Sequence, residues 1–337
     1  MRAIVYHTYG SPDVLELQEV AQPVPKEHDI LIHVHATVVT PADIAFRKGE
    51  PFLGRFISGL RRPKRIPGVE FAGDIEAVGT AVTLFHTGDQ VFGTAGTGFG
   101  AHAEYLCLGE EGVVTTKPTT MTYEEAVAVC DGALTALVFL REKAHMQRGQ
   151  NVLINGASGA VGAAAVQLAR YFGAEVTGVC STTIVELVKS LGAGTVIDYT
   201  TEDFTKNGET YDIIFDAVGT SSFSRCQGSL TPRGVYLATV PTLAIMLQTV
   251  WTAKFGSKKA IFAATGLQQR KANLIFLREL VEAGKLQAVI DRCYPLDHIA
   301  EAHRYVEQGH KKGNVVITVE QQSKPDSSLQ MTEESRV

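Results

Sequence analysis

Apolar residues in the first third of the chain recur at the spacing of β-strands. Residues 2–6, 15–20 and 30–39 alternate between apolar and polar positions or run apolar, and Val, Ile and Leu are frequent in them. Pro and Gly separate these segments and predict turns between them. Residues 66–79 predict a turn and another strand, and residues 101–108 predict one more. We therefore expect this part of the chain to be rich in β-structure.

The pattern changes near Thr122, where strands begin to alternate with helices. Thr122 and Glu125 have the spacing of a capping box, and the apolar run 126–140 is the helix that it would start. The elements expected beyond it are strand 151–155, helix 160–172, strand 175–180, helix 184–191, strands 195–198, 211–216 and 234–238, and a helix at 269–283 that ends before Gly284. Strands that alternate with helices form a doubly wound parallel sheet, so the predicted fold class is α/β.

Composition narrows the class of protein. A length of 337 residues predicts two domains, and a net charge of -5 argues against electrostatic binding of nucleic acid. The five cysteines form no C-x-x-C pair, which predicts neither a disulfide framework nor a cysteine-zinc site and favours a reducing, cytoplasmic location. The N-terminal residues lead into a strand-like segment, so we expect no secretion signal. The longest apolar stretch, 240–253, is too short and too polar to span a bilayer.

A glycine triplet between a strand and an alanine-rich helix is the strongest motif. Gly156 and Gly159 would let the backbone turn and approach a pyrophosphate, and Gly162 would let the helix pack on the strand. The helix N-terminus would offer free N–H groups to the phosphates. The spacing is G-x-x-G-x-x-G, but the strand-turn-helix context predicts a dinucleotide site. The turn residues expected to contact the cofactor are Gly156, Ser158, Gly159, Ala160, Val161 and Gly162. The alternative is a packing turn in another α/β protein.

The residues after the second strand of this unit favour NADPH. An NAD site has an acidic residue about 20 residues beyond the glycines, which binds the ribose 2′-OH. Here strand 175–180 is followed by Ser181, Thr182 and Thr183. Their hydroxyls can donate to a 2′-phosphate, which a carboxylate would repel. The alternative is that they cap the helix beginning near Ile184.

Four further blocks, in order along the chain, resemble those of the medium-chain dehydrogenases and reductases. They are Pro67–Gly73 with Val78–Gly79, Gly88–Gly93, Asp216–Gly219 and Gly313–Ile317. The resemblance extends over residues 1–319. It implies a GroES-like β-rich catalytic domain formed by residues 1–122 and 263–320, and a Rossmann nucleotide-binding domain at 123–262. It also implies an active site in the cleft between them and a homodimer formed through the nucleotide domain. Residues 321–337 are polar, and we expect them to be disordered.

Departures from the family pattern indicate a branch without zinc. Zinc alcohol dehydrogenases have a Cys where Thr40 stands and a His where Val69 stands, so two of three ligands are absent. His33, His35 and His102 could supply nitrogen, but histidines in strands are more often structural. We therefore predict no metal. Without zinc nothing would stabilise an alkoxide. The chain resembles the quinone oxidoreductases, which implies hydride transfer from NADPH to a small electrophile, either a quinone or an α,β-unsaturated carbonyl.

The resemblance also implies residues beside the nicotinamide. Thr40, Asp43 and Arg47 occupy the family's catalytic N-x-x-D region, and Thr135 matches a position near the nicotinamide amide. The alternative for Thr40 is a helix N-cap followed by Pro41, and for Thr135 it is helix packing. No residue stands out as a general acid, so a quinone would take its proton from solvent.

Other cofactor contacts are implied at the adenosine end and at the domain boundary. Tyr199 matches a tyrosine beside the adenosine phosphate. Lys189 would supply the positive charge that the family often has near Thr183, although a solvated role on its helix is the alternative. The remaining cofactor positions implied by the resemblance are Val218, Gly219 and Asn314.

Two other functions stay open at this level. One is a non-catalytic NADPH-binding sensor or structural protein of the same fold, and the other is an interaction protein that docks through residues 240–253. The loops Phe52–Lys64 and Val240–Lys259 carry Phe, Leu, Ile and Trp residues. These residues predict an apolar mouth for a planar acceptor, with core packing as the alternative.

Overall fold

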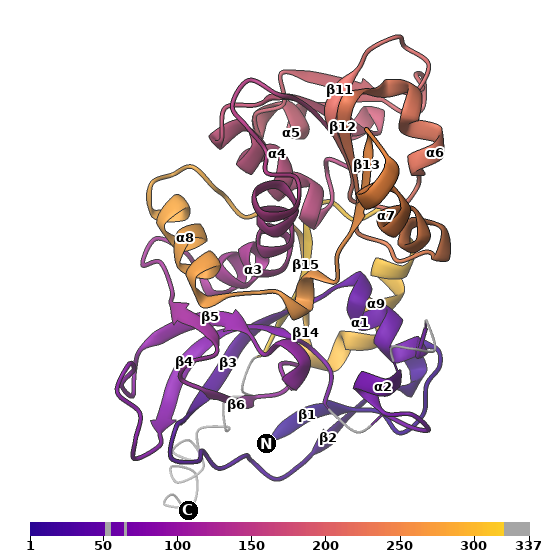
Figure 1. Ribbon diagram of the computed structural model, residues 1–337. Coiled ribbons are helices and arrows are strands. Elements are labelled where there is room, and N and C mark those ends of the chain that lie inside the picture. The colour runs from indigo at the N-terminus through magenta and orange to yellow at the C-terminus, as the bar shows by residue number, and fades with distance from the viewer. Residues whose placement is uncertain (51–54, 64–65, 320–337) are drawn as a thin grey trace, which may run out of the picture.

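A computed structural model of the chain describes residues 1–50, 55–63 and 66–319. The predicted tail at 321–337 and parts of the loop Phe52–Lys64 lie outside the described residues. The described residues form two large sheets, which lie one above the other in Figure 1, and a separate pair of strands. Within the described ranges, no helix is both long enough and apolar enough to cross a membrane.

The lower sheet in Figure 1 combines strands from both ends of the chain. Its strands are β3 (Asp29–Val39), β4 (Glu70–Val78), β5 (Gln90–Thr94), β6 (Tyr105–Gly109), β7 (Val113–Thr116), β14 (Ile290–Pro295) and β15 (Asn314–Thr318). The order is β14-β15-β3-β4-β5-β7, and β6 also pairs with β3. β15 runs antiparallel to β3, with Val316 opposite Val38. A separate antiparallel pair, β1 (Arg2–Val5) and β2 (Glu16–Glu19), lies at the N-terminus. The β-rich first third is therefore confirmed.

The upper sheet is entirely parallel and has the order β10-β9-β8-β11-β12-β13. Its strands are β8 (Asn151–Asn155), β9 (Glu175–Cys180), β10 (Thr195–Asp198), β11 (Tyr211–Asp216), β12 (Leu230–Ala238) and β13 (Lys259–Phe262). The helices between them are α4 (Ala160–Tyr171), α5 (Val185–Ser190), α6 (Phe223–Cys226) and α7 (Leu243–Phe255). The predicted α/β fold is confirmed, whereas the four-residue strand β13, which begins at Lys259, was not predicted.

One long helix joins the two sheets. α3 (Tyr123–Leu137) begins with the predicted capping box, since Glu125 N donates to Thr122 Oγ1 at 3.2 Å and Thr122 N donates to the Glu125 carboxylate at 2.9 Å. A π-helical segment, Val138–Lys143, continues it. Most of its residues are buried, and its core includes Val38 of the lower sheet as well as Ile154 of the upper one. The apolar sequence of α3 is thus explained by contact with both sheets.

The remaining helices surround this framework. They are α1 (Pro41–Lys48), α2 (Arg55–Ser58), α8 (Lys271–Glu282) and α9 (Ile299–Glu307). The predicted helix at 269–283 corresponds to α8, and Gly284 follows it in the left-handed conformation (φ +66°). Short 3-10 turns occur at Pro12–Val14, Gly96–Gly98, Thr182–Ile184, Gln227–Ser229, Thr265–Leu267 and Leu296–His298.

Candidate functional site

The order in which strands are added to the parallel sheet reverses between β8 and β11. From β8 the chain proceeds to β9 and β10 on one side, then crosses to β11, β12 and β13 on the other. In such sheets the loops at the carboxyl ends of the two central strands open a crevice where ligands bind. Here those loops are residues 156–159 after β8 and residues 217–222 after β11.

The three glycines in the first loop and at the start of α4 have different structural surroundings. Gly156 has φ +79°, and a Cβ there would lie 2.4 Å from a methyl carbon of Val218. A Cβ on Gly162 would lie 2.0 Å from the carbonyl oxygen of Gly156. A Cβ on Gly159 would meet only that same oxygen, at 3.6 Å. The protein itself therefore requires Gly156 and Gly162, while the space beside Gly159 is open.

Helix α4 starts at this open space without a side-chain cap. Gly159 is its N-cap residue, with φ -75° and ψ 172°, and it has no side chain that could accept from the first turn. The N–H groups of Ala160, Val161 and Gly162 therefore lack an intrahelical partner. Together with the helix dipole they attract an anion. The carbonyl of Ser158 accepts from Gly313 N at 2.7 Å, which ties the turn to the lower sheet.

A buried carboxylate holds the loop after β11 in place. Asp216 accepts hydrogen bonds from the N–H groups of Gly219 and Ser221, both at 2.9 Å. It also accepts from Asn155 Nδ2 at 3.0 Å and from the Tyr236 hydroxyl at 2.8 Å. The loop that carries Val218 and Gly219 is thus held against the glycine turn, as a site formed by both loops requires. The supporting roles of Asn155 and Asp216 were not predicted.

The hydroxyl cluster after β9 faces a carboxylate from β10. Ser181 makes no capping hydrogen bond, and Thr182 Oγ1 donates to Asp198 Oδ2 at 2.5 Å. The Thr200 hydroxyl donates to the other oxygen of Asp198 at 2.7 Å. Hydrogen bonds from Thr182 and then Thr200 hold the pKa of Asp198 below its usual range, so the group is ionised near neutral pH. Tyr199 follows it and is mostly exposed.

Asp198 is the residue at this edge that sequence reasoning missed. The signal for it was local, because Asp followed two residues later by Thr is the pattern of an Asx-turn. Its carboxylate belongs to the neighbouring strand and not to the end of β9, where an acidic residue was sought. Lys189 does not join this group, because its ammonium pairs with Glu186 of the same helix at 2.9 Å and both side chains are exposed.

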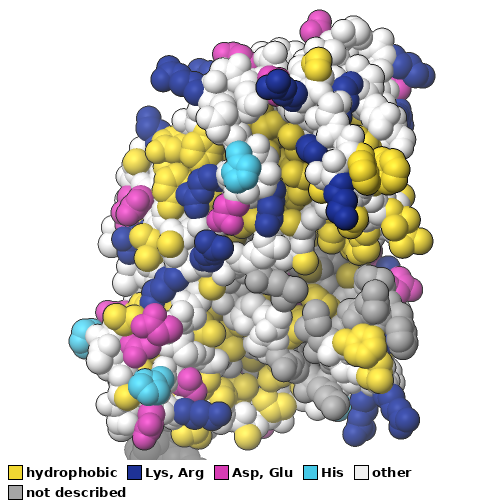
Figure 2. Space-filling model, viewed as in Figure 1, with side chains coloured by type: hydrophobic (Ala, Val, Ile, Leu, Met, Phe, Trp, Pro, Cys, Tyr) yellow, Lys and Arg dark blue, Asp and Glu magenta, His cyan; other side chains and the backbone are white. Residues whose placement is uncertain are grey.

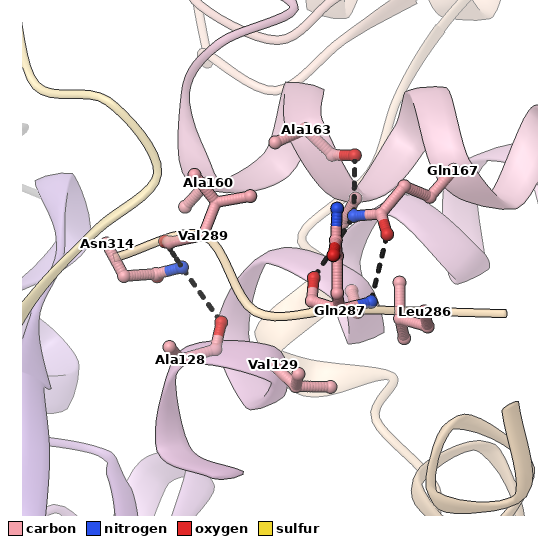
Figure 3. A pocket seen from close by; sticks show the side chains of 11 residues that line it. Ala128, Val129, Ala160, Ala163, Gln167, Leu286, Gln287, Val289 and Asn314 are labelled. Carbon is pink, nitrogen blue, oxygen red and sulfur yellow. Dashed lines mark hydrogen bonds between the residues drawn. The ribbon is translucent and has the colours of Figure 1, made fainter. Parts of the chain in front are cut away.

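Asn314 and Ala160 line a small cavity beside α4 (Figure 3). Its volume is about 10 Å³, which is room for roughly one water molecule. The amide of Asn314 donates to the carbonyls of Ala128 at 2.8 Å and Val289 at 3.2 Å. The side chain expected at the cofactor therefore joins α3 to the segment before β14.

Thr40, Asp43 and Arg47 lie on α1 and are all buried. Thr40 caps the helix, because Asp43 N donates to its Oγ1 at 3.2 Å and its own N–H donates to Asp43 Oδ2 at 2.8 Å. The Thr40 hydroxyl donates to the same oxygen at 2.7 Å. Arg47 forms an ion pair with Glu307 of α9. The capping alternative for Thr40 is thus what the structure shows, and the arginine joins α1 to α9.

Thr135 lies on α3 and is nearly buried. Its hydroxyl oxygen is 3.3 Å from that of Thr265, which follows β13. The contact brings α3 to the end of the parallel sheet, on the side where the carboxyl ends of the strands lie.

A cluster of charged groups beside the glycine turn was also missed. Glu70 is buried, and no partner within the described residues reaches its Oε2. Burial, and then the neighbouring Asp131 carboxyl, raises the pKa of Glu70 well above its usual range. Burial also raises the pKa of Asp131 to about 6, although the Lys311 ammonium opposes this shift. Lys311 Nζ donates to the carbonyl of Gly313 at 2.5 Å, next to the contact with Ser158. Three separate segments supply these groups, so no local pattern indicated them.

The histidines considered as metal ligands have other contacts. His33 stacks on Tyr105, His35 Nε2 is 2.8 Å from Asp74 Oδ2, and His102 Nε2 is 3.0 Å from the carbonyl oxygen of Val38. Over the described ranges, no three His, Cys, Asp or Glu side chains are grouped in a way that could hold a metal ion. The donor set around Thr40 and Val69 does not fit a catalytic zinc, which needs three protein ligands.

Comparison with known proteins gives the same family along most of the chain. A family model described as "Alcohol dehydrogenase GroES-like domain" matches residues 26–119, and one described as "Zinc-binding dehydrogenase" matches residues 191–317. The chain is 32% identical over 331 residues to "Quinone-oxidoreductase homolog, chloroplastic" of Spinacia oleracea, covering 94% of this chain and 98% of that protein.

Another reductase and a solved structure are also similar. The chain is 33% identical over 329 residues to "2-methylene-furan-3-one reductase" of Solanum lycopersicum, covering 94% of this chain and 79% of that protein. The structure of the quinone oxidoreductase from Coxiella burnetii superposes with a TM-score of 0.86 at 28% identity, covering 95% of this chain and 99% of that one.

Proposed function

Since the chain belongs to the medium-chain dehydrogenase/reductase family, in its quinone oxidoreductase-like branch, we propose that it transfers hydride from NADPH to a quinone or an α,β-unsaturated carbonyl. The observation that carries the proposal is the open space at Gly159, where an uncapped helix N-terminus meets the crevice of the parallel sheet. A pyrophosphate fits this combination of free N–H groups and close backbone approach. The quinone and enone acceptors named for the similar proteins give the proposed substrate class.

The proposed preference for NADPH rests on the end of β9. Ser181 has no capping hydrogen bond, and no acidic residue ends that strand. Its hydroxyl is therefore available to donate to a 2′-phosphate. Asp198 acts in the opposite direction, because its ionised carboxylate binds Thr182 and would repel a phosphate placed beside it. We expect NADPH to be preferred, by a margin that Asp198 reduces.

The cofactor supplies the hydride, and the chain's residues position the reactants. The N–H groups of Ala160 and Val161 would hold the pyrophosphate, and the Asp216 network would keep Val218 against it. Thr135 is proposed to contact the nicotinamide end, where its hydroxyl and that of Thr265 form a polar pair. Thr40 and Asp43 are proposed to support this end by fixing the start of α1. The acceptor would take its proton from solvent.

The reaction is proposed to need no zinc. Thr40 and Val69 stand at the ligand positions, and the Thr40 hydroxyl is bonded to Asp43. Alcohol oxidation depends on a group that stabilises the alkoxide, and neither Thr40 nor Val69 supplies a zinc ligand of the kind that such a group needs. The acceptors that remain are already electrophilic at carbon or at a quinone ring.

The assembly and location of the protein are further proposals. β13 is one of the two edge strands of the parallel sheet, so its outer edge can pair with a second copy, which supports a homodimer. All five cysteines are free, which supports a cytoplasmic location.

Stereospecifically deuterated NADPH tests the reaction. Each 4-deuterated epimer would be incubated with an enone and a quinone, and the products analysed by mass spectrometry and NMR. We expect one epimer to transfer its label to the β-carbon of the enone, and simple alcohols not to reduce NADP measurably. Alcohol oxidation without reduction of any quinone or enone would refute the proposal. Tight cofactor binding without turnover of any acceptor would instead favour a non-catalytic sensor.

A further inference from the structure

Helix α7 presents a row of large apolar side chains to solvent. The exposed fractions are 75% for Leu243, 63% for Leu247, 65% for Val250, 65% for Trp251 and 71% for Phe255. The spacing of these positions, near multiples of 3.6, places them along one side of the helix. Single exposed apolar residues are common on protein surfaces, but a contiguous row marks an interaction surface. The alternative of core packing for this segment is therefore wrong for these five side chains.

A groove widens this apolar surface toward α6. Its volume is about 630 Å³, and it is lined by Phe223 and Gln227 on one side and by residues of α7 that include Leu247, Trp251 and Phe255 on the other. Trp251 packs on Phe255 with ring centroids 4.9 Å apart. Figure 2 shows the hydrophobic side chains gathered at the right of the upper sheet, with Lys and Arg side chains beside them.

The chain segment that contains α7 has no negative side chain. Residues 217–278 include no Asp or Glu, although the chain has 36 of them and a net charge of -5. The eight basic residues in the segment are Arg225, Arg233, Lys254, Lys258, Lys259, Arg270, Lys271 and Arg278. The segment is thus strongly positive within a negative protein.

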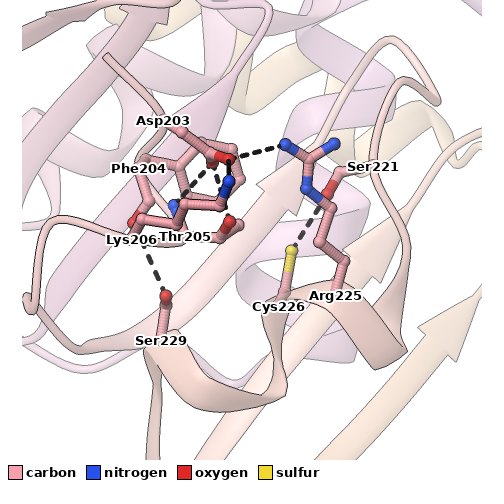
Figure 4. Close-up of polar contacts among 8 residues, drawn as sticks. All are labelled: Asp203, Phe204, Thr205, Lys206, Ser221, Arg225, Cys226 and Ser229. Atoms are coloured by element: carbon pink, nitrogen blue, oxygen red, sulfur yellow. Dashed lines mark hydrogen bonds and ion pairs between the residues drawn. The ribbon is translucent and has the colours of Figure 1, made fainter.

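Three lysines cluster at the C-terminal end of the apolar row. Lys254 is exposed on α7 itself. Lys259 Nζ donates to the carbonyl of Thr252 at 2.6 Å, and Lys258 Nζ donates to that of Gln227 at the same distance, so both ammonium groups are held at this end. Arg225 differs, because Asp203 from outside the segment pairs with it at 2.9 Å (Figure 4). The charge available to a ligand therefore comes mainly from the lysines.

We propose that α7 docks the protein peripherally on an anionic lipid bilayer. The apolar row enters the boundary between headgroups and acyl chains, and the lysines at its end contact anionic headgroups. Exposed apolar and aromatic side chains bind at this boundary, and lysines near them add attraction to anionic lipids. Each lysine near such a surface strengthens binding by attraction to the negative lipids.

A second copy of the chain fits this surface less well. A two-fold interface brings the same surface of both copies together, so the positive charge of this segment would be doubled and not neutralised. Like charges placed together in this way oppose association. The homodimer proposed along β13 would pair backbone groups of the sheet edge.

Trp251 is the only tryptophan, so its fluorescence reports directly on this surface. The full-length protein would be titrated with vesicles of phosphatidylcholine alone and with vesicles containing about 30% phosphatidylserine. We expect the emission to shift to shorter wavelength with the anionic vesicles, and acyl chains brominated near the headgroup to quench it. Partitioning, measured by flotation, should be about tenfold or more stronger for the anionic vesicles and should weaken with salt.

Variants separate the apolar and the charged contributions. The double variant L247Q/V250Q keeps the reporter and should lower partitioning about tenfold or more. Lys254→Glu should lower it by a comparable factor. Val24→Gln replaces another highly exposed valine far from α7 in sequence and should change nothing. Circular dichroism and the thermal unfolding midpoint would check that each variant is folded.

Three results would overturn the proposal. The first is no shift with either vesicle. The second is equal partitioning into neutral and anionic vesicles. The third is an emission that shifts to shorter wavelength without lipid as the protein concentration rises, and that no longer shifts in L247Q/V250Q. This result would show that a second copy of the chain occupies the surface. These measurements involve no turnover, so they are independent of the proposed reaction.

Discussion

Gly159 offers the sharpest test of the cofactor site, because its neighbours leave it free to change. A Cβ at this position meets one atom, the Gly156 carbonyl oxygen, at 3.6 Å, which is ordinary van der Waals contact. Its φ of -75° and ψ of 172° suit any residue. Gly159→Val should therefore fold normally while its branched side chain fills the space in which the pyrophosphate is proposed to lie.

The expected loss of affinity follows from the N–H groups at the start of α4. A hydrogen bond from an N–H group to a charged partner contributes about 1.5–3 kcal/mol. If the valine keeps the pyrophosphate from two of these groups, the loss is about 3 kcal/mol even at the lower value. Since about 1.4 kcal/mol corresponds to a factor of ten, the dissociation constant for NADPH should rise about 100-fold. The free energy of unfolding should change by less than about 1 kcal/mol.

Isothermal titration calorimetry and denaturant unfolding would measure the two quantities separately. Gly162→Ala is one matched control, since its Cβ would lie 2.0 Å from a backbone oxygen and should destabilise the fold itself. Gly228→Ala is the other, because nothing lies within 4 Å of its Cβ, and both quantities should stay unchanged. If Gly159→Val bound NADPH as tightly as the parent, or lost affinity only in proportion to its stability, the proposed position of the pyrophosphate would be wrong.

Three further predictions concern the 2′-site, the metal and the carboxyl group of Asp131. NADPH should bind more tightly than NADH. Ser181→Asp should reverse this order by about tenfold or more through charge repulsion, and Asp198→Asn should increase the preference for NADPH. Calorimetry with both cofactors would measure these affinities, and tighter NADH binding by the parent would contradict the prediction. The purified protein should hold no stoichiometric zinc and keep its activity with chelators, and elemental analysis giving about one zinc per chain would refute this. Because burial raises the pKa of Asp131 to about 6, the folded state binds its proton more tightly than the unfolded chain, so the free energy of unfolding should fall as pH rises from about 4 to about 6. Asp131→Asn should flatten this slope in urea unfolding series, Glu209→Gln should not, and an unchanged slope in Asp131→Asn would contradict the assignment.

Most of the fold could be predicted from the sequence, because the local sequence patterns agree with the tertiary structure. Thr122 and Glu125 predicted the start of α3 to the residue, since a capping box depends only on contacts within one turn. The alternation of strands and helices after Asn151 predicted the parallel sheet for the same reason. β13 was not predicted because four residues are too few to show an alternation of apolar and polar positions. Its strand structure depends on pairing with β12.

The site was less predictable, because its side chains are set by contacts between distant segments. The glycine turn could be read from spacing alone. Arg47, expected at the nicotinamide, is buried against Glu307, which is 260 residues away in the sequence. The Asp198 carboxylate reaches Thr182 only because β10 lies beside β9 in the sheet. Polar residues of this kind have many possible partners, and only the tertiary arrangement selects one.

Helix α3 has a consequence for how the protein unfolds. Its buried side chains belong to a single core. That core also contains residues of β3, β4 and β5 in the lower sheet, of β8 in the upper sheet, and of helix α4. Separating the two sheets would expose the apolar surface of this helix to water, so neither sheet can lose its structure without weakening the other. The two sheets should therefore melt as one cooperative unit. For the same reason, we expect one sheet to move against the other mainly by small sliding movements around α3.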